Sequence, residues 1–548
     1  MTLRPSSFAA GATGGVFGYL LRLRFLVLDF AGILLLYAGF QATWLTLQDP
    51  LNPFDEGLLL THAHLMLAGQ VPHRDFYSTY PPGIYLLIGA AWKIFGTFGW
   101  LPRLIALAIH LATAILAGRL AGRIAGRRYS LLTCGLTLLW MSLLGPPPFA
   151  WIAAMAAALA AAELFLAALR RNRPLLFLCS GLALGAVACL RHDFFIYLCV
   201  TSAAAALVWL LQERFAPLPV FQRAAAWLGL GTIVPIVVVW LPLIAYAGVE
   251  QIAADLYFDQ VKHAMPARRL PFPPFLEINS GARFGLPLPD ILTKPFPAGA
   301  ALALAAPGAA AALLVACRQL QPSHRAAVGV TGVLAVAALP QMLGRTDIFH
   351  VVYVIPPALI LWVALAEMAT RCRTRQIAGA TLAFAVLLLM IFPIRKSIPR
   401  PSRWPSPGWC VGPDARFCGL GLKDGQRQTV EFIQRNTRAG ETIFSGNDQH
   451  QRLVVNDVSL YYLSDRTGAT RYLVFDPNIV TRLDVQRQMT AELGKRVRVA
   501  VLMNGGYFDE PNESRNVGAS WLDEYLGANF EIVGTAESYT WLRRKENP

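Results

Sequence analysis

The sequence predicts a polytopic α-helical membrane protein with a soluble α/β domain at its C-terminal end. The 548 residues are 55% hydrophobic and only 15% charged, and their mean hydropathy is +0.46. A soluble domain usually has about a quarter of its residues charged. Several segments, such as 26–47, 152–169 and 377–394, are nearly uncharged and approach the ~20 residues needed to cross a bilayer. After about residue 394 the composition becomes mixed.

About eleven hydrophobic segments are expected to span the membrane. They are residues 25–47, 100–118, 129–146, 149–169, 174–190, 194–212, 225–247, 297–317, 326–343, 351–370 and 376–393. The N-terminus lacks a small-residue cleavage site after a short apolar stretch. The first span is therefore expected to be an uncleaved signal anchor.

Basic residues set the expected orientation, because Lys and Arg accumulate in cytoplasmic loops. Arg22 and Arg24 precede the first span, and every second loop after it is rich in Arg. We therefore expect a cytoplasmic N-terminus. The loops 48–99, 190–193, 248–296 and 344–350 and the C-terminal tail would then be extracytoplasmic, most simply at a bacterial inner membrane. The Arg-rich cytoplasmic loops also explain the net charge of +15, so no nucleic-acid partner is expected.

The first external loop is expected to contain two helices. Apolar residues in Glu56–Ala68 recur at helical spacing. The apolar, aromatic stretch Pro81–Gly96 is short and includes Lys93, which favours a helix lying at the membrane interface.

The chain is divided into a membrane domain (1–394), a linker (395–418) rich in Pro and Trp, and an α/β domain (419–548). Helical patterns in 426–437, 485–495 and 520–527 alternate with strand-like patterns in 441–446, 496–503 and 530–542, as in α/β folds. No phosphate-binding glycine motif is present, so nucleotide binding is not predicted. Cys410 and Cys418 follow the last span, and either a disulfide or two free thiols is consistent with their position.

Adjacent carboxylates at Asp55 and Glu56 are the first candidate site. A carboxylate at the membrane surface can act as a general base toward a hydroxyl acceptor. The alternative is a helix start, with Asp55 as the N-cap and Glu56 in the first turn. His62 and His64 could bind a metal together with the acids, or they could pack at the interface.

Two further charged clusters fall on the same predicted face. Arg191, His192 and Asp193 follow the fifth span, where they could serve a substrate or simply form an ion pair that ends a helix. Gly344–His350 follows the ninth span. There Arg345 could bind a phosphate through two hydrogen bonds, with Asp347 orienting it.

The loop 248–296 adds basic residues among aromatics and prolines, namely Lys262, His263, Arg268 and Arg269. Such residues suit a lipid phosphate, and they also suit general attraction to an anionic membrane.

Three motifs in the first loop resemble those of a known family. They are D-E-G (Asp55–Gly57), G-x-x-P-x-R-D-F-Y (Gly69–Tyr77) and Y-P-P-G-x-Y (Tyr80–Tyr85). The pattern is similar to the first external loop of GT-C fold glycosyltransferases, in the branch of protein O-mannosyltransferases and the aminoarabinose transferase of lipid A. The similarity continues through G-R-T-D-I-F-H near the end of the membrane domain. It reaches the tail in F-S-G-N-D-Q-H, Y-Y-L-S-D-R and T-R-Y.

The resemblance implies a lipid-linked sugar donor, usually polyprenyl phosphate, and transfer outside the cytoplasm with inversion at the anomeric carbon. Asp55 matches the catalytic acidic position of the family, and Glu56 is the second member of that pair. The aminoarabinose branch has a Glu-Lys pair where this chain has Thr79-Tyr80. Its metal and phosphate contacts are therefore not carried over, and the aminoarabinose substrate is not expected.

The expected function is an inverting glycosyltransferase that moves a sugar from a polyprenyl-phosphate donor to a hydroxyl acceptor. The acceptor stays open between a glycolipid, a polysaccharide and a protein. Asp55 would deprotonate the acceptor, and Arg345 with Lys262, Arg268 or Arg269 would stabilise the leaving phosphate. The remaining expected substrate contacts are Arg74, Asp75, Tyr80, Arg191, Asp193, Asp347 and His350.

The sequence leaves two other functions as alternatives to the transferase. A transporter or flippase of lipid-linked sugars would place charges deep within the spans and show inverted halves. A non-catalytic membrane scaffold would leave the external charged clusters unexplained. A divalent metal stays an open alternative, for which the sequence offers no complete ligand set.

Overall fold

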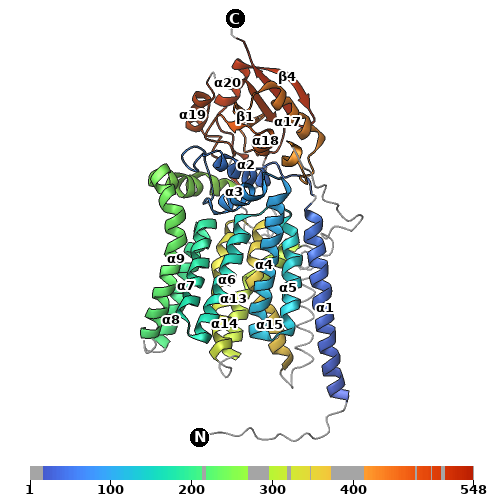
Figure 1. Cartoon of the computed structure of the whole chain (residues 1–548), viewed down its shortest axis with the longest axis vertical. Helices are drawn as coiled ribbons and strands as arrows, with labels where there is room; N and C mark the ends of the chain where they lie inside the picture. Colours follow the sequence, from blue (N-terminus) through green and yellow to red (C-terminus); the bar gives the residue numbers. More distant parts are fainter. Residues whose placement is uncertain are drawn as a thin grey trace, which may run out of the picture.

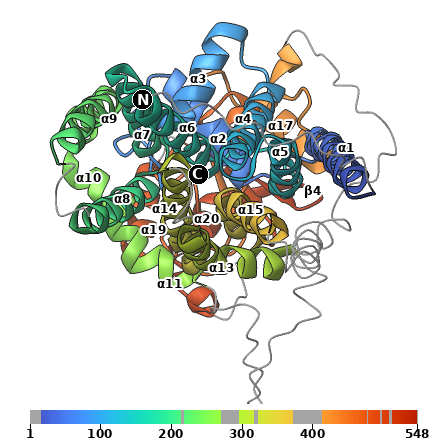
Figure 2. The same ribbon diagram turned by 90° about the horizontal axis from the view of Figure 1, so that it is seen from below.

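A computed structural model of the chain describes residues 16–47, 49–212, 218–269, 295–316, 322–345, 347–371, 413–475, 478–494, 497–507 and 512–546. Long helices stand side by side in a bundle, and a mixed α/β unit lies on one end of it (Figure 1). The view from below shows α1 at the rim of the bundle, beside α5 (Figure 2).

The helices of the bundle alternate in direction along the chain. They are α1 (Val16–Thr46), α4 (Trp100–Ala125), α5 (Arg128–Met141), α6 (Ala150–Arg171), α7 (Pro174–Leu190), α8 (His192–Gln212), α9 (Leu218–Ala247), α13 (Pro295–Ala316), α14 (Pro322–Gly344) and α15 (Ile348–Arg371). A 3-10 turn, η1 (Ser142–Leu144), extends α5.

Eight helices in the described part of the chain are long and apolar enough to cross a membrane, and α5 and α7 are shorter apolar helices. Each of the first ten predicted spans coincides with one of these helices. The eleventh, 376–393, lies outside the described residues. The prediction of a polytopic helical membrane protein is therefore confirmed.

The described parts of the predicted external loops lie together at the upper end of the bundle (Figure 1). They comprise α2 (Asp55–Leu67), α3 (Gly83–Phe95), α10 (Val249–Ala253), the π-helical turns η2 (Ala254–Phe258) and η3 (Gln260–Ala264), and α11 (Met265–Arg268). α3 exposes the side chains of Leu86, Leu87, Ile94 and Phe95. Such an apolar face is what a helix lying at the membrane interface needs.

The C-terminal unit is built on one mixed sheet. Its strands are β1 (Thr442–Asn447), β2 (Thr467–Gly468), β3 (Val499–Met503), β4 (Phe530–Ala536) and β5 (Tyr539–Arg544), in the order β2-β1-β3-β5-β4. β1 pairs in parallel with β2 and β3, with Phe444 opposite Ala500, and β5 is antiparallel to β3 and β4.

The helices of this unit are α17 (Asp424–Asn436), α18 (Ser459–Ser464), α19 (Leu483–Leu493) and α20 (Trp521–Asn529). Two 3-10 turns, η6 (Pro413–Arg416) and η7 (Glu513–Arg515), complete it. Cys418, which follows η6, is disulfide-bonded, and Cys410 lies outside the described residues.

The first external loop and the C-terminal unit share one hydrophobic core. Leu59, Tyr85 and Trp92 of the loop belong to the same buried cluster as Leu460 and Tyr462 of α18. The rings of Trp92 and Tyr462 stack with their centroids 4.9 Å apart and an angle of 4° between their planes. Because apolar burial drives association, the C-terminal unit is fixed to the loop rather than tethered loosely.

Gly57 permits the close approach of α2 and α18. A Cβ atom at position 57 would lie 2.7 Å from the backbone nitrogen of Ser459. Beside it, the Thr61 hydroxyl donates a 2.7 Å hydrogen bond to the carbonyl oxygen of Val458. The glycine of the D-E-G motif is thus explained by packing.

Candidate functional site

Asp55 is the first residue of α2, and its backbone is capped from outside the helix. The N-cap position is Phe54, and the Asn52 side-chain oxygen accepts hydrogen bonds from the N–H groups of Phe54 (3.0 Å) and Asp55 (2.8 Å). The alternative in which Asp55 is the N-cap is therefore wrong. Since Asn52 performs the capping, the Asp55 carboxylate is not needed for it.

The electrostatic surroundings of Asp55 come from segments far away in the sequence. Burial raises the pKa of Asp55, and the charges of Arg268 and His350, with a hydrogen bond from Asn52, lower it. The neighbouring charge of Asp347 raises it again, and the net shift is upward. Asp55 thus shares one environment with Arg268, Asp347 and His350.

Arg345, Asp347 and His350 form a hydrogen-bonded cluster between α14 and α15. The Arg345 Nε donates to Asp347 Oδ2 over 2.6 Å, and the Asp347 Oδ1 lies 2.7 Å from His350 Nδ1. The Arg345 Nη1 also donates to the backbone oxygen of Arg268 over 2.7 Å. Arg345 therefore ties the end of α11, and with it Arg268, to this cluster.

Asp347 is ionised in this arrangement. Burial alone would raise its pKa, but the hydrogen bond from His350 and the charges of His350 and Arg345 hold the pKa well below its usual range. A permanent carboxylate here orients Arg345, as predicted, and keeps a negative charge near Asp55.

Arg191 is paired and lies against aromatic rings. Its Nη2 and Nε donate to the two carboxylate oxygens of Asp193 over 2.7 and 2.9 Å. Its guanidinium carbon lies 4.9 Å from the centre of the Tyr80 ring and 5.5 Å from that of Trp151. Burial would lower the pKa of Arg191, but the Asp193 charge outweighs it and the pKa is raised. Arg191 therefore carries a permanent positive charge next to an aromatic surface.

Tyr353, at the upper end of α15, connects the two charged clusters. It interacts electrostatically with Tyr80, Asp55, Arg191 and Asp347. Its ring stacks with that of Trp151, at 6.0 Å between centroids. The sequence did not single out Tyr353 and Trp151, because a Tyr or Trp at the end of an apolar span carries no charge to mark it.

Glu56 does not face this site. Its side chain is 0% exposed, and its two oxygens accept hydrogen bonds from Arg103 Nε (2.7 Å) and Nη2 (2.9 Å). The Arg103 guanidinium also donates to the backbone oxygens of Leu47, Asp49, Gly419 and Leu420. Contrary to the expectation of a catalytic pair, the geometry gives Glu56 a structural role at the centre of a buried ion pair.

Four other expected site residues lie in different surroundings. Arg74 and Asp75 pair with each other over 2.7 Å near the C-terminal end of α2. That end is roughly 18 Å from Asp55, at about 1.5 Å per helical residue. The Lys262 ammonium lies 5.9 Å from the centre of the Phe258 ring. The Arg269 backbone oxygen accepts a hydrogen bond from Asn512 of the C-terminal unit.

His62 and His64 are packing residues. His62 is fully buried between Phe76 and Tyr85, with ring centroids 4.6 and 5.0 Å away, and burial lowers its pKa to about 3. His64 packs against Tyr462, and burial lowers its pKa to about 4. Within the described ranges, no three His, Cys, Asp or Glu side chains come together in a way that could hold a metal ion.

A buried charged network that the sequence did not reveal joins the loop to the C-terminal unit. Asp255 of η2 lies 3.0 Å from His73 Nδ1, and both its oxygens accept from Arg471 Nη2 over 2.7 and 2.6 Å. His73 and Asp255 are fully buried. The three residues lie in three separate segments of the chain, so sequence spacing gave no signal.

Comparison with solved structures identifies the fold. The chain is similar to the crystal structure of ArnT from Cupriavidus metallidurans bound to undecaprenyl phosphate, with a TM-score of 0.52 and 14% identity over 96% of this chain and 98% of that one. The apo state of the same protein gives a TM-score of 0.51 and 14% identity over 93% and 97%. At this identity the likeness establishes the fold, and the chain has the GT-C fold predicted from its sequence.

A weaker likeness is to the Archaeoglobus fulgidus oligosaccharyltransferase tethered with an acceptor peptide, with a TM-score of 0.45 and 11% identity over 86% of this chain and 69% of that one. No family model matches the sequence, and no curated protein matches it.

Proposed function

We propose that this integral membrane protein is an inverting glycosyltransferase that uses a polyprenyl-phosphate sugar as donor and a hydroxyl group as acceptor, on the extracytoplasmic side. The observation that carries the proposal is the grouping of a partly buried Asp55 with Arg268, Arg345, Asp347 and His350 at one end of the bundle. A base beside cations is the arrangement that sugar transfer from a phosphate requires.

In the proposed reaction, Asp55 accepts the proton of the acceptor hydroxyl as its oxygen attacks the anomeric carbon. A new glycosidic bond forms, and the bond from the anomeric carbon to the phosphate oxygen breaks. The bonding electrons leave with the polyprenyl phosphate, whose added negative charge is stabilised by Arg268. Arg345 holds Arg268 in place through its backbone oxygen. Attack opposite the leaving phosphate inverts the anomeric centre.

The fold supports a lipid-linked donor. ArnT, whose fold this chain shares over nearly its whole length, was crystallised with undecaprenyl phosphate. A polyprenyl chain would lie against the apolar bundle with its phosphate at the level of Asp55. Because such a donor is already activated, the absence of a nucleotide motif from the sequence agrees with the proposal.

The loops and the tail support an extracytoplasmic site. The described parts of the loops predicted to be external lie at the end of the bundle that carries the C-terminal unit (Figure 1). The disulfide bond of Cys418 fits an oxidising compartment.

The test is sugar transfer by the purified full-length protein, with a panel of polyprenyl-phosphate sugars and a membrane extract as the acceptor source. We expect Asp55→Asn to lower the transfer rate by about 10²- to 10⁴-fold, the usual contribution of a general base. The matched control is Asp424→Asn, an exposed carboxylate in the first turn of α17, which should transfer at the wild-type rate.

Equal rates for wild type and Asp55→Asn would refute the assignment of the base. Movement of the intact lipid-linked sugar between leaflets of a proteoliposome, without transfer, would favour the transporter instead.

A further inference from the structure

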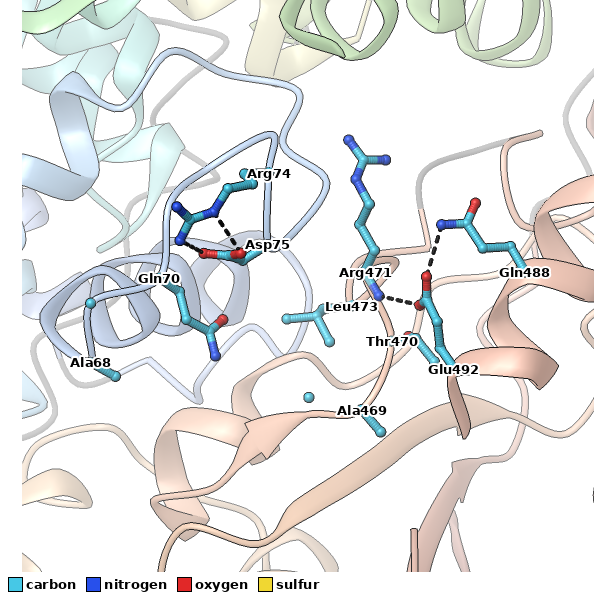
Figure 3. Close-up of a pocket in the computed structure, with 12 residues that line it drawn as sticks. Ala68, Gln70, Arg74, Asp75, Ala469, Thr470, Arg471, Leu473, Gln488 and Glu492 are labelled. Carbon is cyan, nitrogen blue, oxygen red and sulfur yellow. Dashed lines mark hydrogen bonds and ion pairs between the residues drawn. The ribbon is translucent and has the colours of Figure 1, made fainter. Parts of the chain in front are cut away.

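A cavity of about 590 Å³ lies between the first external loop and the C-terminal unit (Figure 3). One wall comes from the segment after α2, with Gln70, Arg74 and Asp75. The other comes from the loop after β2 and from α19, with Arg471, Gln488 and Glu492. The volume lies within the range of about 300–1,000 Å³ that small-molecule sites occupy.

The chemistry of the walls is polar and rich in hydrogen-bonding groups. Amides of Gln70 and Gln488, carboxylates of Asp75 and Glu492 and the guanidinium of Arg74 offer both donors and acceptors. Among the residues that the structure describes, no aromatic side chain lines the cavity, and Leu473 is its one large apolar side chain. An apolar ligand would therefore gain little by entering it.

The charges around the cavity are already compensated. Arg74 pairs with Asp75, and the Arg471 guanidinium is held by both oxygens of Asp255. Glu492 accepts from the backbone N–H of Arg471 (2.7 Å) and from Gln488 (2.8 Å). An anionic ligand would have to compete with Asp75 or Asp255 for each cation, so the cavity favours an uncharged ligand.

We propose that this cavity binds an uncharged carbohydrate through hydrogen bonds to its hydroxyl groups. The occupant must be polar, neutral and able to use donors and acceptors on both walls, and a neutral glycan has these properties. The cavity opens near the C-terminal end of α2, whereas Asp55 lies at the N-terminal end, roughly 18 Å away.

This distance makes the cavity a second site, apart from the reaction centre. We assign the cavity to the part of a glycan acceptor that lies away from the reacting hydroxyl, and this assignment rests on the proposed function. Binding of a carbohydrate does not depend on catalysis.

The test is binding of neutral di-, tri- and tetrasaccharides of glucose, mannose or galactose to the full-length protein in detergent, followed by saturation-transfer NMR. We expect saturable signals from wild type and from Asp55→Asn. Gln488→Trp should fill the cavity and weaken binding at least tenfold. Gln434→Trp, another exposed glutamine on a helix of the same unit, should bind like wild type.

A second variant, Gln70→Ala, removes hydrogen bonds from the opposite wall without adding bulk, and it should also weaken binding. The proposal is overturned if no oligosaccharide of the panel binds, if Gln488→Trp and Gln70→Ala both bind normally, or if inorganic phosphate displaces the sugar. Loss of transfer in Asp55→Asn with normal sugar binding would separate the two proposals.

Discussion

Asp55, Glu56 and Gly57 are consecutive residues with three different roles. Asp55 faces the cluster of Arg268 and His350, Glu56 is buried against Arg103, and Gly57 admits the backbone of α18. The sequence placed Asp55 on the same predicted external face as these cations, and its role as the base stays a prediction. The sequence did not distinguish the role of Glu56 from that of Asp55. Arg103, the partner of Glu56, lies 47 residues away within a predicted membrane span.

The pH dependence of transfer should report on Asp55. The proposed reaction needs the carboxylate, so the rate should rise with pH through the Asp55 pKa, which burial raises above its usual value. Arg268 is the largest charge that lowers this pKa, so Arg268→Leu should move the inflection to higher pH. Initial rates across the acidic range measure the shift.

Arg269→Leu is the control for this profile, because Arg269 is not among the main groups that shift the Asp55 pKa and should leave the inflection in place. An unchanged inflection in Arg268→Leu would contradict the assignment.

The effect of Asp55 on stability runs in the opposite direction to its effect on the transfer rate. At a pH between its unfolded and folded pKa values, Asp55 takes up a proton on folding. The free energy of unfolding therefore falls as pH rises across that interval.

Glu56 should matter for stability rather than for chemistry. Glu56→Gln leaves the Arg103 cation buried without its counter-charge, which should lower the free energy of unfolding by about 3–5 kcal/mol. Thermal unfolding in detergent measures the loss, and transfer per folded molecule should stay at the wild-type rate at low temperature. If Glu56→Gln is as stable as wild type but no longer transfers sugar, Glu56 takes part in the reaction and its structural assignment is wrong.

At the scale of elements, hydropathy and length predicted most of the helices. In the described part of the C-terminal unit, the patterns also predicted α17, α19, α20 and strands β1, β3, β4 and β5. α18 and β2 were missed, because six and two residues are too few to show a period. The shared core was missed for a different reason, since its halves are far apart in the sequence.

The contact between α2 and α18 should depend on the absence of a side chain at Gly57. Gly57→Ala places a Cβ 2.7 Å from the Ser459 nitrogen, so α18 must move away and the melting temperature should fall. Gly89→Ala in α3 is the matched control, because its Cβ would meet Leu67 at an ordinary 3.7 Å. Thermal unfolding compares the two, and equal melting temperatures would show that the approach is not constrained.

At the scale of the whole molecule, the Asp255 network holds three parts of the chain together. Arg471→Ala leaves Asp255 buried without its cation, at a cost of about 3–5 kcal/mol. The C-terminal unit should then become sensitive to protease at lower temperature than in wild type. Arg435→Ala, an exposed arginine of α17, should not change the digestion. Identical digestion of both variants would mean that the shared hydrophobic core alone holds the unit.

The shared core also has a consequence for synthesis. Thr61 and its partner Val458 are separated by 397 residues. At about 5–20 residues per second, the ribosome needs roughly 20–80 seconds to make the second after the first. During that time Leu59, Tyr85 and Trp92 leave the ribosome without the residues that later cover them. A nascent chain therefore carries an incomplete loop until the residues of α18 have been made, and the end of the bundle that carries Asp55 is completed only then.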